Sequence, residues 1–257
     1  DTLFYLFSAI SGQEVFRFGD KGRGVCEFYY PLFLSNSFAY DSLIIYDIPV
    51  GRLTKIDLHA LVENQDITKC VNSEHLYRNL NFMYNFNKID SAFIGTFIEK
   101  DEGLFSFCNR NNGEIKNTDY VPYYFYEKGR KDAYCHHVLV SEKDNSIIVP
   151  FKYMNLINCY DLDGNLKVTY ALDWIKEEIN TQIRVDEHTT VTFYRTYATR
   201  NRCYLVWDGH KIEEELRKYP AKIVVMNWQG ELEKVYQLDN FADFIIPDEK
   251  QRMIYVG

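Results

Sequence analysis

The residues best suited to chemistry in this chain of 257 residues begin with an adjacent histidine pair, His136 and His137. Adjacent residues of a β-strand point to opposite faces, so the two imidazoles are poorly placed to chelate one metal ion. A His-Glu-x-x-His motif or comparable metal-ligand spacing is absent from the sequence. We therefore expect no metal site and no cofactor.

Carboxylates are abundant, and a pair of them facing each other across a cleft could perform acid–base catalysis on a glycosidic bond. Most of them lie in turn-like segments, where Asp favours the local backbone geometry, so a structural role is the better interpretation. The Asp-x-Asp-Gly sequence at 161–164 resembles the start of a calcium loop, but Leu172 occupies the twelfth position, where Glu is required. The carboxylates considered are Asp161, Asp163, Asp186, Glu187 and Asp248.

The glycines of Gly19-x-x-Gly22-x-Gly24 resemble a phosphate-binding loop only superficially. Aromatic, strand-like residues follow them, whereas the dinucleotide fingerprint opens a helix, and the Gly-Lys-Ser/Thr of a Walker loop is missing. The chain also lacks a Gly-x-Ser-x-Gly elbow and a recognisable Cys–His pair. We predict a turn between blades at this position and no catalytic residues in the chain.

The elements that position these residues are repeated strand–turn–strand hairpins with Gly at the turn. The clearest copies are 158–172 and 225–238, and two more strand-like runs precede each of them, at 136–140 and 146–151, and at 191–197 and 202–207. Two strands and a hairpin make one four-stranded blade, so the sequence predicts an all-β fold, a single β-propeller domain over 1–257. The turn glycines are Gly12, Gly51, Gly113, Gly164 and Gly230.

The two ends of the chain suggest how the ring closes. Residues 241–246 and 253–256 have the pattern of the first two strands of a blade, and the N-terminal hairpin has the pattern of the last two. We expect these terminal strands to pair and thereby protect the sheet edges. Short helical patches are predicted from Asp173 to Ile179 and from Lys211 to Tyr219.

Composition excludes several classes of function. Aromatic residues make up 16% of the chain, hydrophobic residues 46%, and the formal charge is −8, so a nucleic-acid partner is not expected. No stretch is long and apolar enough for a membrane-spanning helix. Cys108, Cys159 and Cys203 lie in apolar runs and are expected to be buried, unpaired thiols.

Several segments resemble the TolB-like six-bladed propeller family of bacterial extracytoplasmic proteins, many of them lipoproteins. Segment 16–28 is similar to its glycine-rich turn and Glu-Phe pair, with Val25 and Cys26 where the family has Pro and Gly. Residues 91–97 and 133–134 are similar to family positions, and 224–255 is the best match, through Asn227-Trp-Gln-Gly, Tyr236-Gln-Leu-Asp and the ending Ile254-Tyr255. Nearly the whole chain is covered.

The resemblance implies six blades, whereas the hairpins alone give five. We favour six, with further strands expected in 57–86 and upstream of Asp1, because the chain starts without Met, directly in strand-like sequence. The resemblance also implies a periplasmic or cell-surface location, with membrane contact only through an upstream lipid anchor. It implies no particular activity.

Function in a propeller is expected at the loops and first strands that converge on the central funnel. We predict a non-catalytic binding module for a protein, peptide or glycan. The alternative is a carbohydrate- or ester-directed hydrolase or lyase, which requires a His, an Arg and a carboxylate to converge from different blades. A third alternative is a purely structural subunit. The candidate binding residues are Tyr30, Tyr84, His136, His137, Arg195 and Tyr197.

Overall fold

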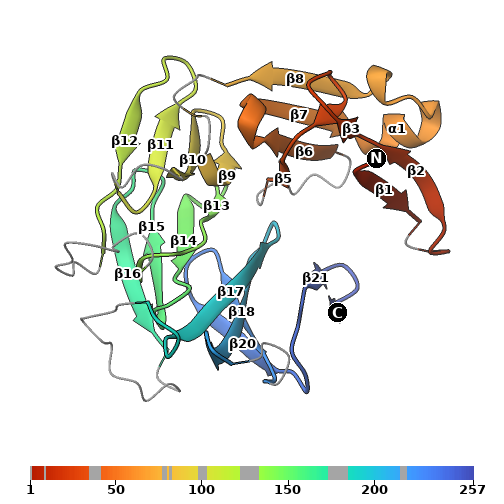
Figure 1. Cartoon of the computed structure of the whole chain (residues 1–257). Coiled ribbons are helices and arrows are strands. Elements are labelled where there is room, and N and C mark those ends of the chain that lie inside the picture. The colour runs from red at the N-terminus through yellow and green to blue at the C-terminus, as the bar shows by residue number, and fades with distance from the viewer. Residues whose placement is uncertain are drawn as a thin grey trace. The chain divides into compact units, whose positions relative to one another are not determined.

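The computed structural model describes residues 2–8, 10–34, 42–76, 80, 83–97, 103–121, 133–172, 185–214 and 219–257. These residues contain four four-stranded sheets, and in each sheet the strands follow one another in chain order (Figure 1). Backbone contacts divide the chain into two compact units, described separately below. The first holds 1–100 and 107–115, and the second holds 101–106 and 116–257.

The first unit contains one complete sheet, β5 (Pro31–Phe33), β6 (Ser42–Asp47), β7 (Arg52–Asp57) and β8 (Val71–His75), together with two-stranded pairs. The pairs are β1 (Phe4–Phe7) with β2 (Glu14–Phe18) and β3 (Asp20–Lys21) with β4 (Glu27–Phe28). Most residues of a second sheet also belong to this unit, and its strands are β9 (Met83–Lys88), β10 (Ala92–Phe97), β11 (Ser106–Asn109) and β12 (Ile115–Asn117). Three helical segments are η1 (Ile48–Val50), α1 (Leu58–Asn64) and η2 (Ile67–Lys69).

The core of the first unit is largely aromatic. Tyr46 is fully buried and stacks on Phe86, with ring centroids 4.5 Å apart, and Phe86 lies 5.1 Å from Phe93. Offset aromatic pairs of this kind stabilise a sheet beyond the area they bury. The high aromatic content of the sequence therefore has a structural use in this core.

The second unit contains two complete sheets and a terminal hairpin. One sheet is β13 (Leu139–Ser141), β14 (Ser146–Pro150), β15 (Leu156–Tyr160) and β16 (Leu166–Ala171). The next is β17 (Thr190–Ala198), β18 (Arg202–Lys211), β19 (Lys222–Asn227) and β20 (Leu232–Gln237). The hairpin is β21 (Ile245–Asp248) with β22 (Met253–Val256). Strands β14 and β15 are buried along their whole length, whereas most of β16 and β20 is exposed.

The predicted hairpins are confirmed. All five turn glycines have a positive φ, between 62° and 85°, which an L-residue adopts only at a cost. The strand pairs around Gly164 and Gly230 are β15–β16 and β19–β20, and the runs predicted ahead of them are β13–β14 and β17–β18. The all-β class follows directly from this repeat.

The predicted blade number is wrong. The described residues form four complete four-stranded sheets, so neither six nor five blades is supported. Segment 57–86, where the sequence predicts further strands, contains α1, η2, β8 and the start of β9. Asp57 caps α1 by accepting a hydrogen bond from the Ala60 N–H at 2.9 Å, so the residues directly after it are helical.

The predicted pairing of the terminal strands stays a prediction. In the first unit β1 pairs with β2, and in the second unit β21 pairs with β22. The prediction that the whole chain is a single domain stays a prediction.

The remaining sequence predictions have mixed outcomes. The helical patch at 173–179 lies outside the described residues. Lys211 ends β18 and is followed by a turn, so the start of the second helical patch is wrong, and 215–218 are outside the described residues. Cys108, Cys159 and Cys203 are buried and form no disulfide, as expected. None of the described helices could cross a membrane.

Candidate functional site

The six candidate residues divide between the two units. Tyr30 lies in the first unit, 61% exposed, and its backbone N–H donates to Asp47 Oδ1 at 2.9 Å. Tyr84 lies in β9, and its side chain is outside the described residues. The other four candidates, His136, His137, Arg195 and Tyr197, lie in the second unit, where the geometry can be followed.

The start of β17 is fastened to the segment that follows β14. The Thr192 N–H donates to the Lys152 carbonyl at 2.8 Å, and its hydroxyl lies 2.8 Å from the carbonyl oxygen of Phe151. The Lys152 N–H in turn donates to the Cys135 carbonyl at 2.7 Å, which fixes the chain just before the histidine pair. These bonds bring side chains from two consecutive sheets to one place.

The two histidines are neutral hydrogen-bond donors. His137 Nε2 lies 3.0 Å from the carbonyl oxygen of Tyr194, and because a carbonyl only accepts, this nitrogen carries the proton. Burial, together with the positive charges of Lys152 and Arg195, lowers the pKa of His137 to about 4, against the opposing effect of the hydrogen bond to Tyr194. His136 Nδ1 donates to the Tyr134 carbonyl at 2.6 Å, and burial lowers its pKa to about 4. The two rings thus bind different carbonyl oxygens.

Two cations lie beside these histidines, against an aromatic ring. Lys152 Nζ is 5.0 Å from the centroid of the Tyr194 ring and 5.1 Å from that of Tyr153. The guanidinium carbon of Arg195 is also 5.0 Å from the Tyr194 centroid, within the range of cation–π attraction. An Arg195 guanidinium nitrogen lies 3.8 Å from Asp243 Oδ1, a loose ion pair on a partly exposed side chain.

A β-bulge interrupts the pairing of β17 with β18 next to these residues. Val191 of β17 pairs with His210, and two residues later Phe193 pairs with Trp207, so β18 has one extra residue in this stretch. Gly209 lies inside it with a φ of +70°, and a left-handed Gly is typical of such bulges. Asp208 and His210, on either side of Gly209, are both buried.

Asp208 is the most perturbed carboxyl group at this place. It is 3% exposed, and no described residue forms a hydrogen bond with either of its carboxylate oxygens. Burial raises its pKa to about 7, against the opposing effect of Arg195 and Lys152. His210 is 2% exposed, burial lowers its pKa, and its Nδ1 likewise has no described partner. We call Lys152, Arg195, Asp208 and His210, with His137 beside them, the Asp208 cluster.

Two members of this cluster, His137 and Arg195, were predicted from the sequence, whereas Lys152, Asp208 and His210 were not. The sequence feature that indicates the last two is Asp-Gly-His directly after a run of strand residues. Asp-Gly usually marks a turn, so the sequence predicts that the strand ends at Trp207, one residue before the site. Tyr197 lies outside the cluster and packs on apolar residues around Tyr204.

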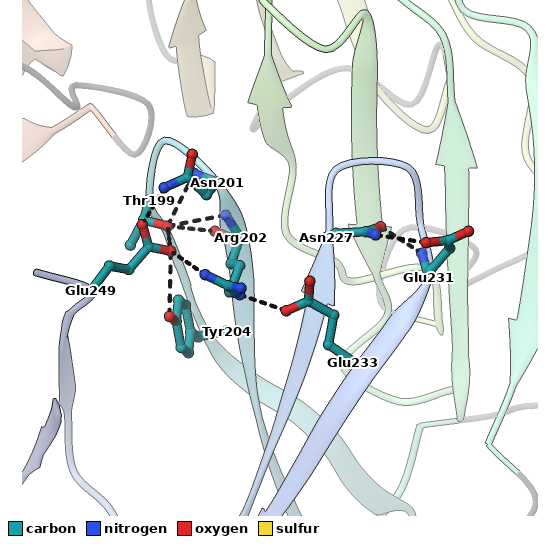
Figure 2. A network of polar contacts seen from close by, with 8 residues as sticks. All are labelled: Thr199, Asn201, Arg202, Tyr204, Asn227, Glu231, Glu233 and Glu249. Atoms are coloured by element: carbon teal, nitrogen blue, oxygen red, sulfur yellow. Dashed lines mark hydrogen bonds and ion pairs between the residues drawn. The ribbon is translucent and has the colours of Figure 1, made fainter. Parts of the chain in front are cut away.

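A second polar network lies at the other end of the β17–β18 hairpin (Figure 2). Glu249, in the turn between β21 and β22, accepts from the Thr199 hydroxyl at 2.6 Å and from Asn201 Nδ2 at 2.7 Å. Arg202 contacts Glu249 at 3.7 Å and donates to Glu233 of β20. This network fastens the terminal hairpin to its neighbouring sheet, and every charged group drawn in it has a partner, so we assign it a structural role.

Four consecutive four-stranded meanders place this chain in the β-propeller class. No family model and no curated protein sequence matches it. Among solved structures, it is similar to a member of the DUF4221 family from Bacteroides vulgatus, at 13% identity and a TM-score of 0.57, over 92% of this chain and 74% of the other. At this identity the similarity concerns the fold alone.

Two further solved structures are less similar. A putative exported protein from Bacteroides fragilis has 12% identity and a TM-score of 0.48, over 91% of this chain and 64% of the other. A catalytically inactive virginiamycin B lyase from Staphylococcus aureus, crystallised with quinupristin, has 11% identity and a TM-score of 0.43, over 90% and 61%. The chain thus spans less than two thirds of the length of both proteins.

Proposed function

We propose that this chain is a non-catalytic binding module, and that its ligand contacts the Asp208 cluster. The supporting observation is a concentration of buried polar atoms that lack a partner. Of seven such atoms among the described residues, five belong to the β17–β18 hairpin: Arg195 Nε, Trp207 Nε1, both Asp208 oxygens and His210 Nδ1. Each unsatisfied buried group costs about 1–3 kcal/mol, so a ligand that satisfies them gains that free energy on binding.

The proposed location of the protein and the proposed classes of ligand rest on the sequence and on the side chains at the site. The resemblance to the TolB-like family supports an extracytoplasmic location, periplasmic or at the cell surface, and a lipid anchor upstream would be the only contact with a membrane. Protein, peptide and glycan ligands are all compatible with a site that combines cations, hydrogen-bonding groups and the half-buried rings of Tyr153, Tyr194 and Trp207. The net charge of −8 argues against nucleic acid.

The test is binding of the full chain to glycan and peptide arrays, followed by titration of each hit with variants. Arg195→Ala and Lys152→Met are expected to weaken binding at least tenfold. Lys234→Ala, which removes an exposed cation from the outer strand β20 of the same sheet, is the matched control and should bind like the wild type. A hit whose affinity is unchanged in both cluster variants would show that the ligand binds elsewhere.

The second candidate, a hydrolase or lyase acting on carbohydrate or an ester, is favoured by one observation. A carboxyl group with a pKa of about 7 transfers protons well at neutral pH, and His and Arg side chains accompany it from two consecutive sheets. For an enzyme, Asp208→Asn should abolish turnover of an identified ligand while its Kd changes less than threefold. If the wild type binds that ligand and leaves it intact, the binding module is the correct choice.

A further inference from the structure

The Asp208 cluster has an excess of positive charge that the described residues do not balance. Lys152 forms no ion pair with a described carboxylate, and Arg195 forms only the loose pair with Asp243. No ion pair among the described residues joins Asp208 to either cation, and both of its oxygens are buried without a described partner. The positive charges of Arg195 and Lys152 nevertheless lower its pKa, so both cations act on this carboxyl group electrostatically.

The charges of Lys152, Arg195 and Asp208 indicate which kind of ligand group can bind beside them. A metal cation would be repelled by Lys152 and Arg195, and the described residues contain no group of three metal-ligating side chains. A dianion such as phosphate would bring two negative charges beside a buried carboxyl group. Lys152 and Arg195 carry two positive charges and the Asp243 carboxylate carries one negative charge, so one further negative charge on the ligand makes the site neutral. Oxygen atoms of the ligand can also accept hydrogen bonds from the unpartnered donors Arg195 Nε and Trp207 Nε1.

We propose that the Asp208 cluster binds a carboxylate group of the ligand, with Lys152 and Arg195 donating to its oxygens and the Asp208 carboxyl sharing a hydrogen bond with it. This inference rests on the proposed binding function and specifies its ligand chemistry. Uronic-acid sugars and acidic peptides both carry such a carboxylate, and the experiment separates these two sources.

Binding of a carboxylate beside Asp208 is linked to a proton. Two carboxyl groups that share a hydrogen bond cannot both be ionised, so the bound state keeps Asp208 protonated. Since the pKa of free Asp208 is about 7, the affinity should fall as the pH rises above that value, by up to tenfold per pH unit. A ligand held by the cations alone would not show this dependence in that range.

The experiment titrates the full chain calorimetrically with two matched pairs of probes at pH 6 and pH 8. One pair is trigalacturonate and its fully methyl-esterified form, and the other is acetyl-Glu-Glu-Glu-amide and acetyl-Gln-Gln-Gln-amide. We expect one acidic probe to bind at least tenfold more tightly than its neutral counterpart, which also identifies the source. Lys152→Met and Arg195→Ala should each weaken it at least tenfold, and Lys234→Ala should not.

Asp208→Asn tests the linkage between binding and protonation directly, because the amide keeps a hydrogen-bond donor but cannot ionise. Its affinity at pH 6 should stay within about threefold of the wild type, and the loss of affinity between pH 6 and pH 8 should disappear. Circular dichroism of each variant checks that it is folded.

Three outcomes would overturn the inference. These are equal binding of neutral and acidic probes, unchanged affinity in Arg195→Ala and Lys152→Met, and no binding by either acidic probe. If neutral ligands bind and lose affinity in the cluster variants, the proposed binding function is supported and only the proposal of a carboxylate ligand is wrong. If no array ligand depends on the cluster, the proposed function itself fails.

Discussion

The indole ring of Trp207 lies directly over Gly209, so closely that a Cβ atom on Gly209 would be 2.0 Å from Trp207 Cη2. The backbone between these two residues forms the bulge of β18, and Gly209 has a φ of +70°. Asp208 and His210, on either side of Gly209, alternate with Trp207 and Gly209 along β18 and both lie on the buried face of the strand. A side chain at 209 would displace the ring, the bulge or both.

Substitution of Gly209 by Ala therefore combines two costs, and Gly12 allows them to be separated. Gly12 has nearly the same φ, +68°, but a methyl group on it would meet no described atom within 4 Å. Gly12→Ala should lower the free energy of unfolding by about 1–2 kcal/mol through backbone strain alone. Gly209→Ala should lower it by at least about 1 kcal/mol more, because the ring must move. Urea unfolding of both variants measures the difference, and equal losses would show that the ring contact carries no energy.

Asp208 should make the protein less stable as the pH rises. Its pKa is 3.8 in an ordinary environment and about 7 in the folded chain, so the folded state binds the proton more tightly. This contribution to stability is fully present below pH 3.8 and is lost as the pH rises towards 7. Between pH 5 and pH 8 the wild type should lose at most about 3 kcal/mol relative to Asp208→Asn. Urea unfolding of both proteins at these pH values tests this, and a constant difference would mean that Asp208 is not perturbed.

The histidines should titrate in opposite directions from the ordinary value of 6.5. His136 and His137 have pKa values of about 4, chiefly through burial, whereas the hydrogen bond and charge of Glu213 raise the pKa of exposed His188. The neutral forms of His136 and His137 contribute stability above pH 6.5 that is lost as the pH falls towards 4. Nitrogen-detected NMR at pH 6 should show a proton on Nε2 of His137 and on Nδ1 of His136, with His188 mainly charged. A charged His137 at pH 6 would contradict its lowered pKa, and a neutral His137 with its proton on Nδ1 would contradict the hydrogen bond to Tyr194.

The sequence predicted the repeated hairpins well because Gly marks each turn, and a positive φ leaves little choice of residue there. It failed on blade number. Segment 57–86 does contain β8 and the start of β9, but these strands complete the two sheets whose turn glycines are Gly51 and Gly113, so they add no further blade. Only part of the Asp208 cluster could be predicted from the sequence, because Gly again indicates a turn. Asp208-Gly209 has the composition of a turn, and only the pairing of β17 with β18 shows that it is a bulge inside a strand.

Glu249 should control how firmly the β21–β22 hairpin is held. It accepts hydrogen bonds from Thr199 and Asn201, so Glu249→Ala leaves both donors without their partner (Figure 2). The loss of these bonds should cost about 1–2 kcal/mol, which corresponds to roughly 5- to 30-fold faster amide hydrogen exchange where the hairpin opens separately. Glu233→Ala is the matched control, because Glu233 also binds Arg202 but lies on the outer strand β20.

The measurement is hydrogen exchange by mass spectrometry over peptides that cover 245–257. Faster exchange in Glu249→Ala, with the rest of the sheet and the Glu233→Ala protein unchanged, would show that the network holds the hairpin. Exchange at the wild-type rate would instead assign that role to the apolar contact, in which Ala242 and Ile245 pack on Tyr204 and its neighbours. The two contributions differ in their response to salt, because only the ionic network is screened. At 1 M NaCl the effect of Glu249→Ala should therefore shrink, whereas the apolar packing should hold the hairpin as before.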